Sequence, residues 1–190
     1  MKKLICLILT LLFLCPTAFA EVPAEETPEF TFRNGIRWGM TPEQVRAAEG
    51  READDFYPTR DSVDILEFYD VPVSRYTSDL VYIFVNDTLY GACYCGFDTD
   101  YISASCHYLN GALSSVYGNP VPVEPDVINQ FMIDISDGNN TGNFGDSLEW
   151  HAADDTKIWL TFYGDYDIYI FYVSPEFDAS LIGTYDITGL

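Results

Sequence analysis

The feature that most constrains the fold is a short helix within residues 35–50, because the sequence specifies both of its ends. Thr41 is a good N-cap, since its hydroxyl can accept a backbone N–H that the first helical turn leaves free. Pro42 suits the first helical position, and Gln44 falls where it can complete a capping box. Gly50 can take the left-handed conformation that ends a helix. A helix this short is not stable alone, so we expect it to dock on a sheet formed by later residues.

Alternating side chains predict two β-hairpins later in the chain, each with an aliphatic and an aromatic face. Residues 80–85 and 89–97 form the first, around a predicted loop of three residues, 86–88. One of its faces carries Val81, Ile83, Val85, Leu89, Cys93 and Cys95, and the other carries Tyr82, Phe84, Tyr90 and Tyr94. The second hairpin joins residues 157–163 and 167–173. Its faces carry Ile158, Leu160, Phe162, Ile168 and Ile170, and Trp159, Thr161, Tyr163, Tyr169, Phe171 and Val173.

A second helix is predicted over residues 99–117 and ends at Gly118 and Pro120. Its apolar stripe recurs at three- and four-residue spacing and comprises Ile102, Cys106, Leu109, Leu113 and Val116. In the long connection that follows, periodicity does not decide between a helix and a strand at residues 126–135. Residues 148–152 begin the next strand.

Two segments between the first helix and the first hairpin have different patterns. Residues 51–61 are charged and contain Pro58, which predicts a loop. Residues 63–73 contain an apolar run that Pro72 closes. Since proline is tolerated in edge strands, we expect an edge strand there.

These elements follow the order helix, three strands, helix, three strands, which is a weak internal repeat. Neither half could bury its sheet face well alone. The predicted fold class is α+β, in which a tandem repeat of a helix and antiparallel strands forms one continuous antiparallel sheet with both helices on its aliphatic face. The repeats occupy about residues 30–97 and 98–178 of a single domain over residues 30–178.

The first twenty residues have the pattern of a secretory signal peptide. Lys2 and Lys3 precede an apolar run, and residues 18–20 supply small side chains for cleavage. The Pro- and Glu-rich segment 21–29 is predicted to be a disordered acidic leader, and residues 179–190 an irregular C-terminal tail. We therefore expect a secreted or cell-envelope protein of bacterial type without a membrane span.

Charge restricts the class of partner. The formal net charge is −21, and it becomes two units more negative once Lys2 and Lys3 are removed. Such a surface repels nucleic acid and anionic membranes. The balance favours solubility outside the cell and basic partners.

Three cysteines lie beyond the predicted signal peptide, namely Cys93, Cys95 and Cys106. In an oxidising compartment one pair can form a disulfide, and the odd count leaves one thiol. The spacing contains no pair of Cys-x-x-Cys motifs, so it does not predict a zinc site. We expect Cys106 to pack next to Cys93 or Cys95, because the helical stripe and the aliphatic sheet face carry them.

The sequence from Trp38 to Gly50 resembles the helix-one signature of secreted proteins related to beta-lactamase inhibitory protein. A shorter version, Gly-x-Thr-x-x-Gln-Val followed by Gly, is similar to a segment of the small lipoprotein of the outer-membrane barrel-assembly machinery. The repeat order is similar to the tandem helix-and-sheet design of the inhibitor. The chain lacks the paired disulfides of that family. The resemblance implies a module whose open sheet face binds another protein.

The strongest candidate binding surface is the second face of the predicted sheet. Tyrosine and tryptophan bring large rigid area with a polar tip, which suits interfaces and sugar platforms. The candidate partner-binding residues are Tyr82, Phe84, Tyr90, Tyr94, Trp159, Tyr163, Tyr169 and Phe171. The alternative is that the long connection or a second subunit covers them as ordinary core.

Catalytic and metal motifs are weak. Residues 137–146 carry ligand-type side chains with calcium-loop spacing, but position twelve is Leu148, and a flexible Asn/Gly turn explains the same residues. No serine or cysteine is visibly paired with His107 or His151, so a catalytic triad has no support. We expect no cofactor, no metal and no enzymatic activity.

The predicted function is a secreted, non-enzymatic module that binds an unknown protein partner. The alternatives are an extracellular carbohydrate-binding or hydrolase domain that uses the same face, and a structural envelope protein. An enzyme should have carboxylates or histidines converging in a pocket beside the aromatic residues. A protein-binding module should instead have a broad and shallow face.

The signal peptide gives the first testable prediction. Mass spectrometry of protein recovered from the secreting cells should find Glu21 at the N-terminus, because cleavage follows the small residues 18–20. Retention of the first twenty residues, or lipidation of Cys15, would contradict it.

Overall fold

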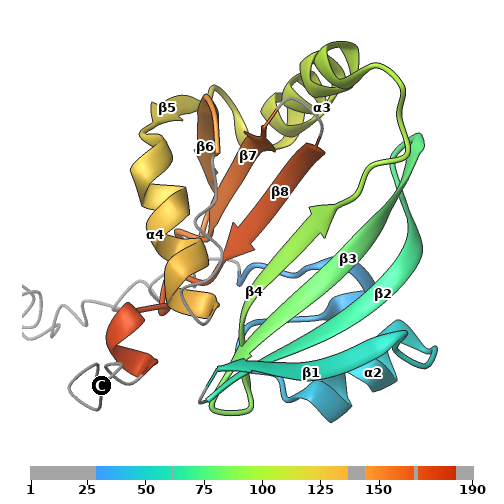
Figure 1. The fold of residues 1–190 in the computed structure, drawn as a ribbon, viewed down its shortest axis with the longest axis vertical. Helices are drawn as coiled ribbons and strands as arrows, with labels where there is room; N and C mark the ends of the chain where they lie inside the picture. The colour runs from blue at the N-terminus through green and yellow to red at the C-terminus, as the bar shows by residue number, and fades with distance from the viewer. Residues whose placement is uncertain (1–28, 61, 137–143, 165–166, 183–190) are drawn as a thin grey trace, which may run out of the picture.

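The computed structural model describes residues 29–60, 62–136, 144–164 and 167–182. Within these residues, eight strands form one antiparallel sheet in the order β1-β2-β3-β4-β8-β7-β6-β5 (Figure 1). The predicted α+β class with one continuous antiparallel sheet is therefore confirmed. The expected signal peptide and most of the expected leader lie outside the described residues.

The first half of the sheet follows a short helical segment. Its elements are η1 (Arg33–Gly35), α2 (Pro42–Glu49), β1 (Asp55–Arg60), β2 (Val63–Val73), β3 (Tyr76–Val85) and β4 (Thr88–Cys95). The second half contains α3 (Ile102–Tyr117), β5 (Val121–Val123), α4 (Pro125–Ile135), β6 (Ser147–His151), β7 (Lys157–Tyr163) and β8 (Asp167–Val173). A 3-10 turn, η2 (Ala179–Leu181), lies in the segment expected to be irregular.

The capping signals of the first helix are observed in α2. The Thr41 hydroxyl accepts a hydrogen bond from the Gln44 backbone N–H at 3.4 Å, and the Gln44 side chain accepts one from the Thr41 N–H at 2.9 Å. Gly50 follows with a left-handed φ of 69°. Val45 is fully buried, which supplies the docking that so short a helix needs.

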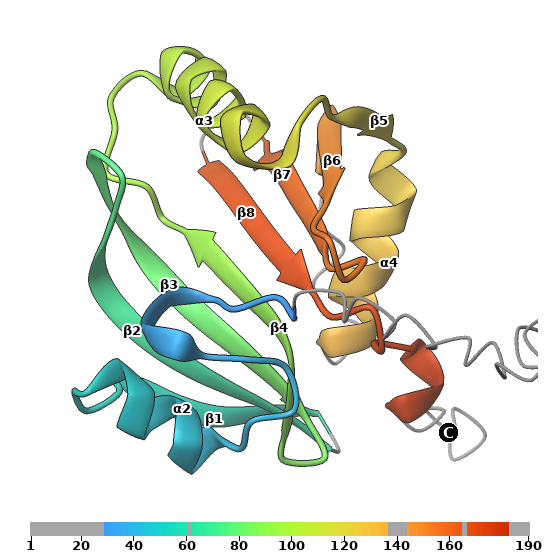
Figure 2. The ribbon, with the colours of Figure 1, turned by 180° about the vertical axis from the view of Figure 1, so that it is seen from behind.

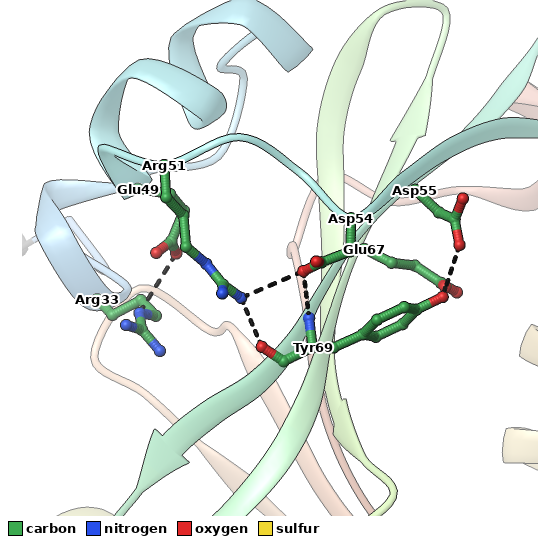
Figure 3. Close-up of polar contacts among 7 residues, drawn as sticks. All are labelled: Arg33, Glu49, Arg51, Asp54, Asp55, Glu67 and Tyr69. Atoms are coloured by element: carbon green, nitrogen blue, oxygen red, sulfur yellow. Dashed lines mark hydrogen bonds and ion pairs between the residues drawn. The ribbon is translucent and has the colours of Figure 1, made fainter.

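A buried carboxylate fixes the end of α2. The Glu49 side chain is only 3% exposed and pairs with Arg33 Nε at 3.3 Å (Figure 3). It also accepts hydrogen bonds from Asn34 Nδ2 at 2.9 Å and from the Tyr82 hydroxyl on β3. One carboxylate therefore ties η1, α2 and the sheet together.

Both faces of the sheet are covered. Figure 2 shows α2 and α3 on one face, and Figure 1 shows α4 on the other. The buried cluster on the first face, here the α2/α3 cluster, includes Val45, Leu66, Phe68, Tyr82, Phe84, Tyr94, Leu109, Trp150, Leu160, Ile170 and Tyr172. The buried cluster on the second face, here the α4 cluster, includes Ile65, Ile83, Val85, Cys93, Ile128, Phe131, Phe144, Trp159, Phe171 and Val173.

The expectation that the aromatic residues of both hairpins share one face is wrong. β4 pairs with β8 so that Cys93 lies opposite Phe171 and Tyr94 lies opposite Ile170. Paired residues point to the same face of a sheet. The aromatic face of each hairpin therefore continues into the aliphatic face of the other, and the sheet has no single aliphatic face. Local alternation cannot reveal this register, because β4 and β8 are far apart in the sequence.

The first hairpin has a two-residue turn instead of the predicted three-residue loop. Asn86 and Asp87 both have positive φ, of 51° and 61°, as a type I′ turn requires. The register then shifts, so that Ile83 pairs with Gly91 and Phe84 with Leu89. This irregularity returns Cys93 to the predicted face but moves Leu89 into the α2/α3 cluster.

Two strands form where none was predicted, namely β1 in the expected loop and β5 in the long connection. β2 is therefore an inner strand, not an edge strand. Its Pro72 is tolerated because β1 pairs only with the segment from Val63 to Glu67. No residue of β1 therefore pairs with β2 at Pro72.

The helices also refine the prediction. α3 begins at Ile102, later than predicted, and Val116 is 70% exposed because Tyr117 continues the stripe from Leu113. The segment 126–135, which periodicity left undecided, is helical in α4. In the described part of the chain, no helix is long and apolar enough to cross a bilayer.

The expected contact of Cys106 with Cys93 or Cys95 is wrong. Cys106 belongs to the α2/α3 cluster, whereas Cys93 belongs to the α4 cluster on the opposite face. All three of these thiols are free.

The buried carboxylate gives a stability prediction. Glu49→Ala leaves Arg33 and the Tyr82 hydroxyl without their shared acceptor, so it should lower the free energy of unfolding by about 3 kcal/mol. Urea denaturation measures it. The matched control is Glu43→Ala on the same helix, whose side chain is 78% exposed and which should change the stability much less. Equal effects of the two substitutions would contradict the anchoring role.

Candidate functional site

The predicted aromatic site is not one open surface. Five of its members are almost fully buried, in both clusters, namely Tyr82, Phe84, Tyr94, Trp159 and Phe171. Tyr90 and Tyr169 are half-buried, and Tyr163 is 39% exposed. Tyr82, Phe84 and Tyr94 face the α2/α3 cluster, whereas Trp159 and Phe171 face the α4 cluster. The prediction that Tyr90 shares a face with Tyr82 is also wrong, because the register shift in β4 turns Tyr90 toward the α4 cluster. The alternative weighed from the sequence, ordinary core, describes most of these residues.

Figure 1 shows that α4 covers only part of its face of the sheet. A cleft lies between α4 and the strands beside it. Its volume is about 230 Å³. The walls come from β1–β4, α4 and β8 and comprise Tyr57, Thr59, Ile65, Glu67, Val81, Ile83, Cys93, Cys95, Met132, Ile135, Ser136, Tyr169 and Phe171. Of the eight predicted residues, the cleft includes only Tyr169 and Phe171.

One end of the cleft is closed by contacts between β1 and the C-terminus of α4. The Thr59 hydroxyl donates to the Ile135 carbonyl at 2.6 Å, and Arg60 Nη1 donates to the Asp134 carbonyl at 2.7 Å. These donors satisfy carbonyls that the last helical turn leaves free. The contacts hold α4 and β1 together across the cleft.

Carboxylates and tyrosines form the rim of the cleft, here the rim cluster, which comprises Asp55, Tyr57, Glu67 and Tyr69. Asp55 on β1 lies directly opposite Glu67 on β2. The Tyr57 hydroxyl donates to Glu67 at 2.7 Å. The Tyr69 hydroxyl lies 2.6 Å from Asp55 and 3.1 Å from Glu67 (Figure 3). Like charges directly opposite each other repel, and the hydrogen bonds from the two tyrosine hydroxyls offset part of this repulsion.

The backbone of Tyr69 is held by a second set of contacts. Its N–H donates to Asp54 at 2.7 Å, and its carbonyl accepts from Arg51 Nη2 at 2.7 Å (Figure 3). Arg51 also pairs with Asp54 at 3.6 Å and stacks over the Phe68 ring. Arg51 therefore positions Tyr69 and does not neutralise the carboxylates of the rim cluster.

The charges at this end of the sheet are not compensated. Burial and the carboxylates of Asp70, Glu67 and Asp167 raise the pKa of Asp79, against a backbone hydrogen bond at Asp70 that lowers it. The pKa of Tyr69 is raised because its hydroxyl donates hydrogen bonds to the carboxylates of Asp55 and Glu67. Among the ion pairs between described residues, none includes Asp55 or Glu67. The rim therefore presents net negative charge to solvent.

A larger hollow of about 530 Å³ lies on the other face, beneath α3. Leu148, Leu160 and Phe162 form its apolar floor, and Glu124 and Asp146 contribute carboxylates. His107 also lines it, but no hydrogen bond between described residues joins this histidine to either carboxylate. The cleft beside α4 is the stronger candidate, because its rim holds a hydrogen-bonded polar cluster.

The rim cluster is not among the site residues predicted from the sequence. The charge and the proline of residues 51–61 predict a loop, in which Asp55 and Tyr57 share no face with β2. The signal was present, since Asp55 and Tyr57 alternate with Phe56, and Glu67 and Tyr69 alternate with Phe68. A strand at 55–60 paired with 63–67 would have placed them together.

The predicted calcium loop cannot be compared with the fold, because residues 137–143 lie outside the described residues. Within the described ranges, no three His, Cys, Asp or Glu side chains lie close enough to hold a metal ion. His151 contacts Glu149 at 2.8 Å, and Glu149 also accepts from Trp159 Nε1 at 2.6 Å.

The buried position of Trp159 predicts a large loss of stability on truncation. Trp159 is 3% exposed and packs against Phe131 and Phe171, so Trp159→Ala should cost about 3–5 kcal/mol in thermal or urea unfolding. The control Val116→Ala, at a position 70% exposed, should change stability by less than about 0.5 kcal/mol. A small effect of Trp159→Ala would place this ring on an open surface after all.

The raised pKa of Asp79 predicts a pH-dependent gain on neutralisation. A carboxyl whose folded pKa lies above its ordinary 3.8 destabilises the folded protein once ionised. Asp79→Asn should therefore raise the melting temperature at about pH 7. The gain should vanish at about pH 3, where the Asp79 carboxyl is protonated in the folded and in the unfolded protein. The exposed Asp98→Asn serves as control. A lower melting temperature for Asp79→Asn at neutral pH would contradict the electrostatic account.

Comparison with known proteins adds no further constraint. No protein-family model matches the sequence, and neither a curated protein nor a solved structure matches it. The similarity of residues 38–50 to the beta-lactamase inhibitory protein family therefore remains a resemblance in one short motif and in element order. Any function must be argued from the cleft and its rim.

Proposed function

We propose that this protein is a secreted, non-enzymatic module that binds a basic segment of another protein through the cleft and its rim cluster. The cleft accepts an apolar side chain of that segment, and the rim accepts a lysine or arginine. The segment would lie across β1 and β2, beside the C-terminal end of α4.

The observation that carries this proposal is the hydrogen-bond count at the rim. A tyrosine hydroxyl has one proton to donate. Tyr57 donates to Glu67, and Tyr69 lies within hydrogen-bond distance of both Asp55 and Glu67, so two protons serve four carboxylate oxygens and acceptor positions are left over. A cation from a partner would complete the set, with charge-assisted hydrogen bonds that are stronger than those of neutral donors.

The setting also favours a protein partner. Tyr57 and Tyr69 are 40% and 38% exposed, and exposed tyrosines are enriched among residues that dominate binding energy. The net charge of −21 attracts basic proteins over a long range at low salt. The resemblance to the inhibitor family, which implies binding of another protein, supports this proposal.

A non-enzymatic role is part of the proposal. Both histidines are exposed and lie away from the lining of the cleft, since His107 is on α3 and His151 ends β6. The rim groups are already engaged in hydrogen bonds with each other, which suits recognition more than proton transfer.

A glycan ligand is the second candidate, because Asp55 and Glu67 converge on one hydroxyl beside an exposed tyrosine. Paired carboxylates next to aromatic rings bind and hydrolyse sugars in glycosidases. The two candidates differ in their response to salt, since a charged protein segment is screened by salt and a neutral sugar is not.

The test begins with affinity capture from the native secretome and then measures the affinity of the captured protein for purified variants. The double variant Asp55→Asn/Glu67→Gln should bind about tenfold or more weakly, because it removes the two rim carboxylates. The control Asp87→Asn/Glu176→Gln makes the same change in net charge at exposed positions outside the cleft and should bind like wild type.

Two outcomes would count against the proposal. Equal weakening of both double variants would mean that net charge alone attracts the partner. Binding of neutral oligosaccharides that is lost in Asp55→Asn/Glu67→Gln and unaffected by salt would favour the glycan candidate instead.

A further inference from the structure

The floor of the cleft contains an unusual concentration of sulfur. Cys93 and Cys95 occupy neighbouring positions on the same face of β4, and both line the cleft. Met132 on α4 lines the same cleft from the opposite wall. Two thiols and one thioether therefore face one cavity, although they come from different elements.

The two thiols are free. Neither is in a disulfide, and the Cys93 thiol donates a hydrogen bond to the Tyr94 carbonyl at 3.4 Å. Cys93 is buried, whereas Cys95 is only partly so. The pair is thus reached from solvent on the Cys95 side, which gives a ligand an entry path.

Strand geometry disfavours a disulfide between Cys93 and Cys95. Same-face neighbours on a strand are about 6.7 Å apart along the chain, at the far end of the Cα separations in which disulfides form. A bridging metal ion relaxes this limit, since each metal–thiolate bond adds about 2.3 Å between the sulfurs.

We propose that Cys93 and Cys95, with Met132 as a third ligand, bind one Cu(I) ion in the floor of the cleft. Thiolate and thioether sulfur select Cu(I) over harder ions. Binding releases one proton from each thiol, so that two sulfur–hydrogen bonds are exchanged for two copper–sulfur bonds without a change of oxidation state.

The neighbouring groups distinguish this site from a zinc site. A structural zinc site needs four ligands, and no three His, Cys, Asp or Glu side chains converge among the described residues. The two thiolates and the thioether are soft donors, which suit Cu(I). Glu67 lies in the same cleft and adds to the negative potential that attracts a cation.

This inference does not rest on the proposed protein-binding function, because copper binding is measured with the metal alone. Purified protein is titrated anaerobically into the Cu(I) complex of bicinchoninate, whose colour reports copper withdrawal. Wild type should withdraw one equivalent of Cu(I). Cys95→Ser should abolish this, and Met132→Leu should weaken it while leaving binding detectable.

The chain offers matched controls for both ligand types. Cys106→Ser removes a thiol on the opposite face of the sheet, and Met40→Leu removes a thioether in the α2/α3 cluster. Both should withdraw copper like wild type. Cys93→Ser is a second test, with circular dichroism to confirm its fold, and Cys95→Ser at the more exposed position decides the result if Cys93→Ser unfolds.

X-ray absorption of the copper-loaded protein should find only sulfur neighbours. Failure of wild type to compete for Cu(I), retention of copper by Cys95→Ser, loss of copper in Cys106→Ser, or nitrogen and oxygen neighbours would each overturn the assignment.

Discussion

The pairing of β4 with β8 is the contact on which the rest of the structure depends. Four residue pairs, from Gly91 opposite Val173 to Tyr94 opposite Ile170, join two four-stranded halves into the one sheet described. Their side chains alternate between the α2/α3 cluster and the α4 cluster, so both cores meet at this junction. A shift of one residue would exchange the faces of one entire half.

The same register creates the candidate site. It sends the aromatic rings of the second hairpin under α4, while the thiols and short aliphatic side chains of the first hairpin form the floor beside this helix. Because these side chains are small, a cleft remains between them and α4. The cross-strand pair of Asp55 and Glu67 then places like charges at its rim.

The predictions that depend on residues close in the sequence succeed, and those that depend on contacts between distant segments fail. The caps of α2, the second hairpin and most of α3 depend on residues close in sequence, and these predictions were right. The common face of the aromatic residues, the Cys106 contact and the open site depended on the β4–β8 register, and these were wrong. The rim cluster was missed because Pro58 argued against a strand that tolerates it at the sheet edge. Met132 could not be placed beside the thiols without knowing which face α4 covers.

The central claim is that a partner engages the rim and the cleft, and hydrogen–deuterium exchange of the protein with and without its captured partner tests it most directly. The account predicts slower exchange in β1, in β2 around Glu67 and Tyr69, and at the C-terminal end of α4, with α3 and β5 unchanged. Protection confined to α3, β5 and the hollow beneath them, with β1 and β2 unaffected, would contradict it.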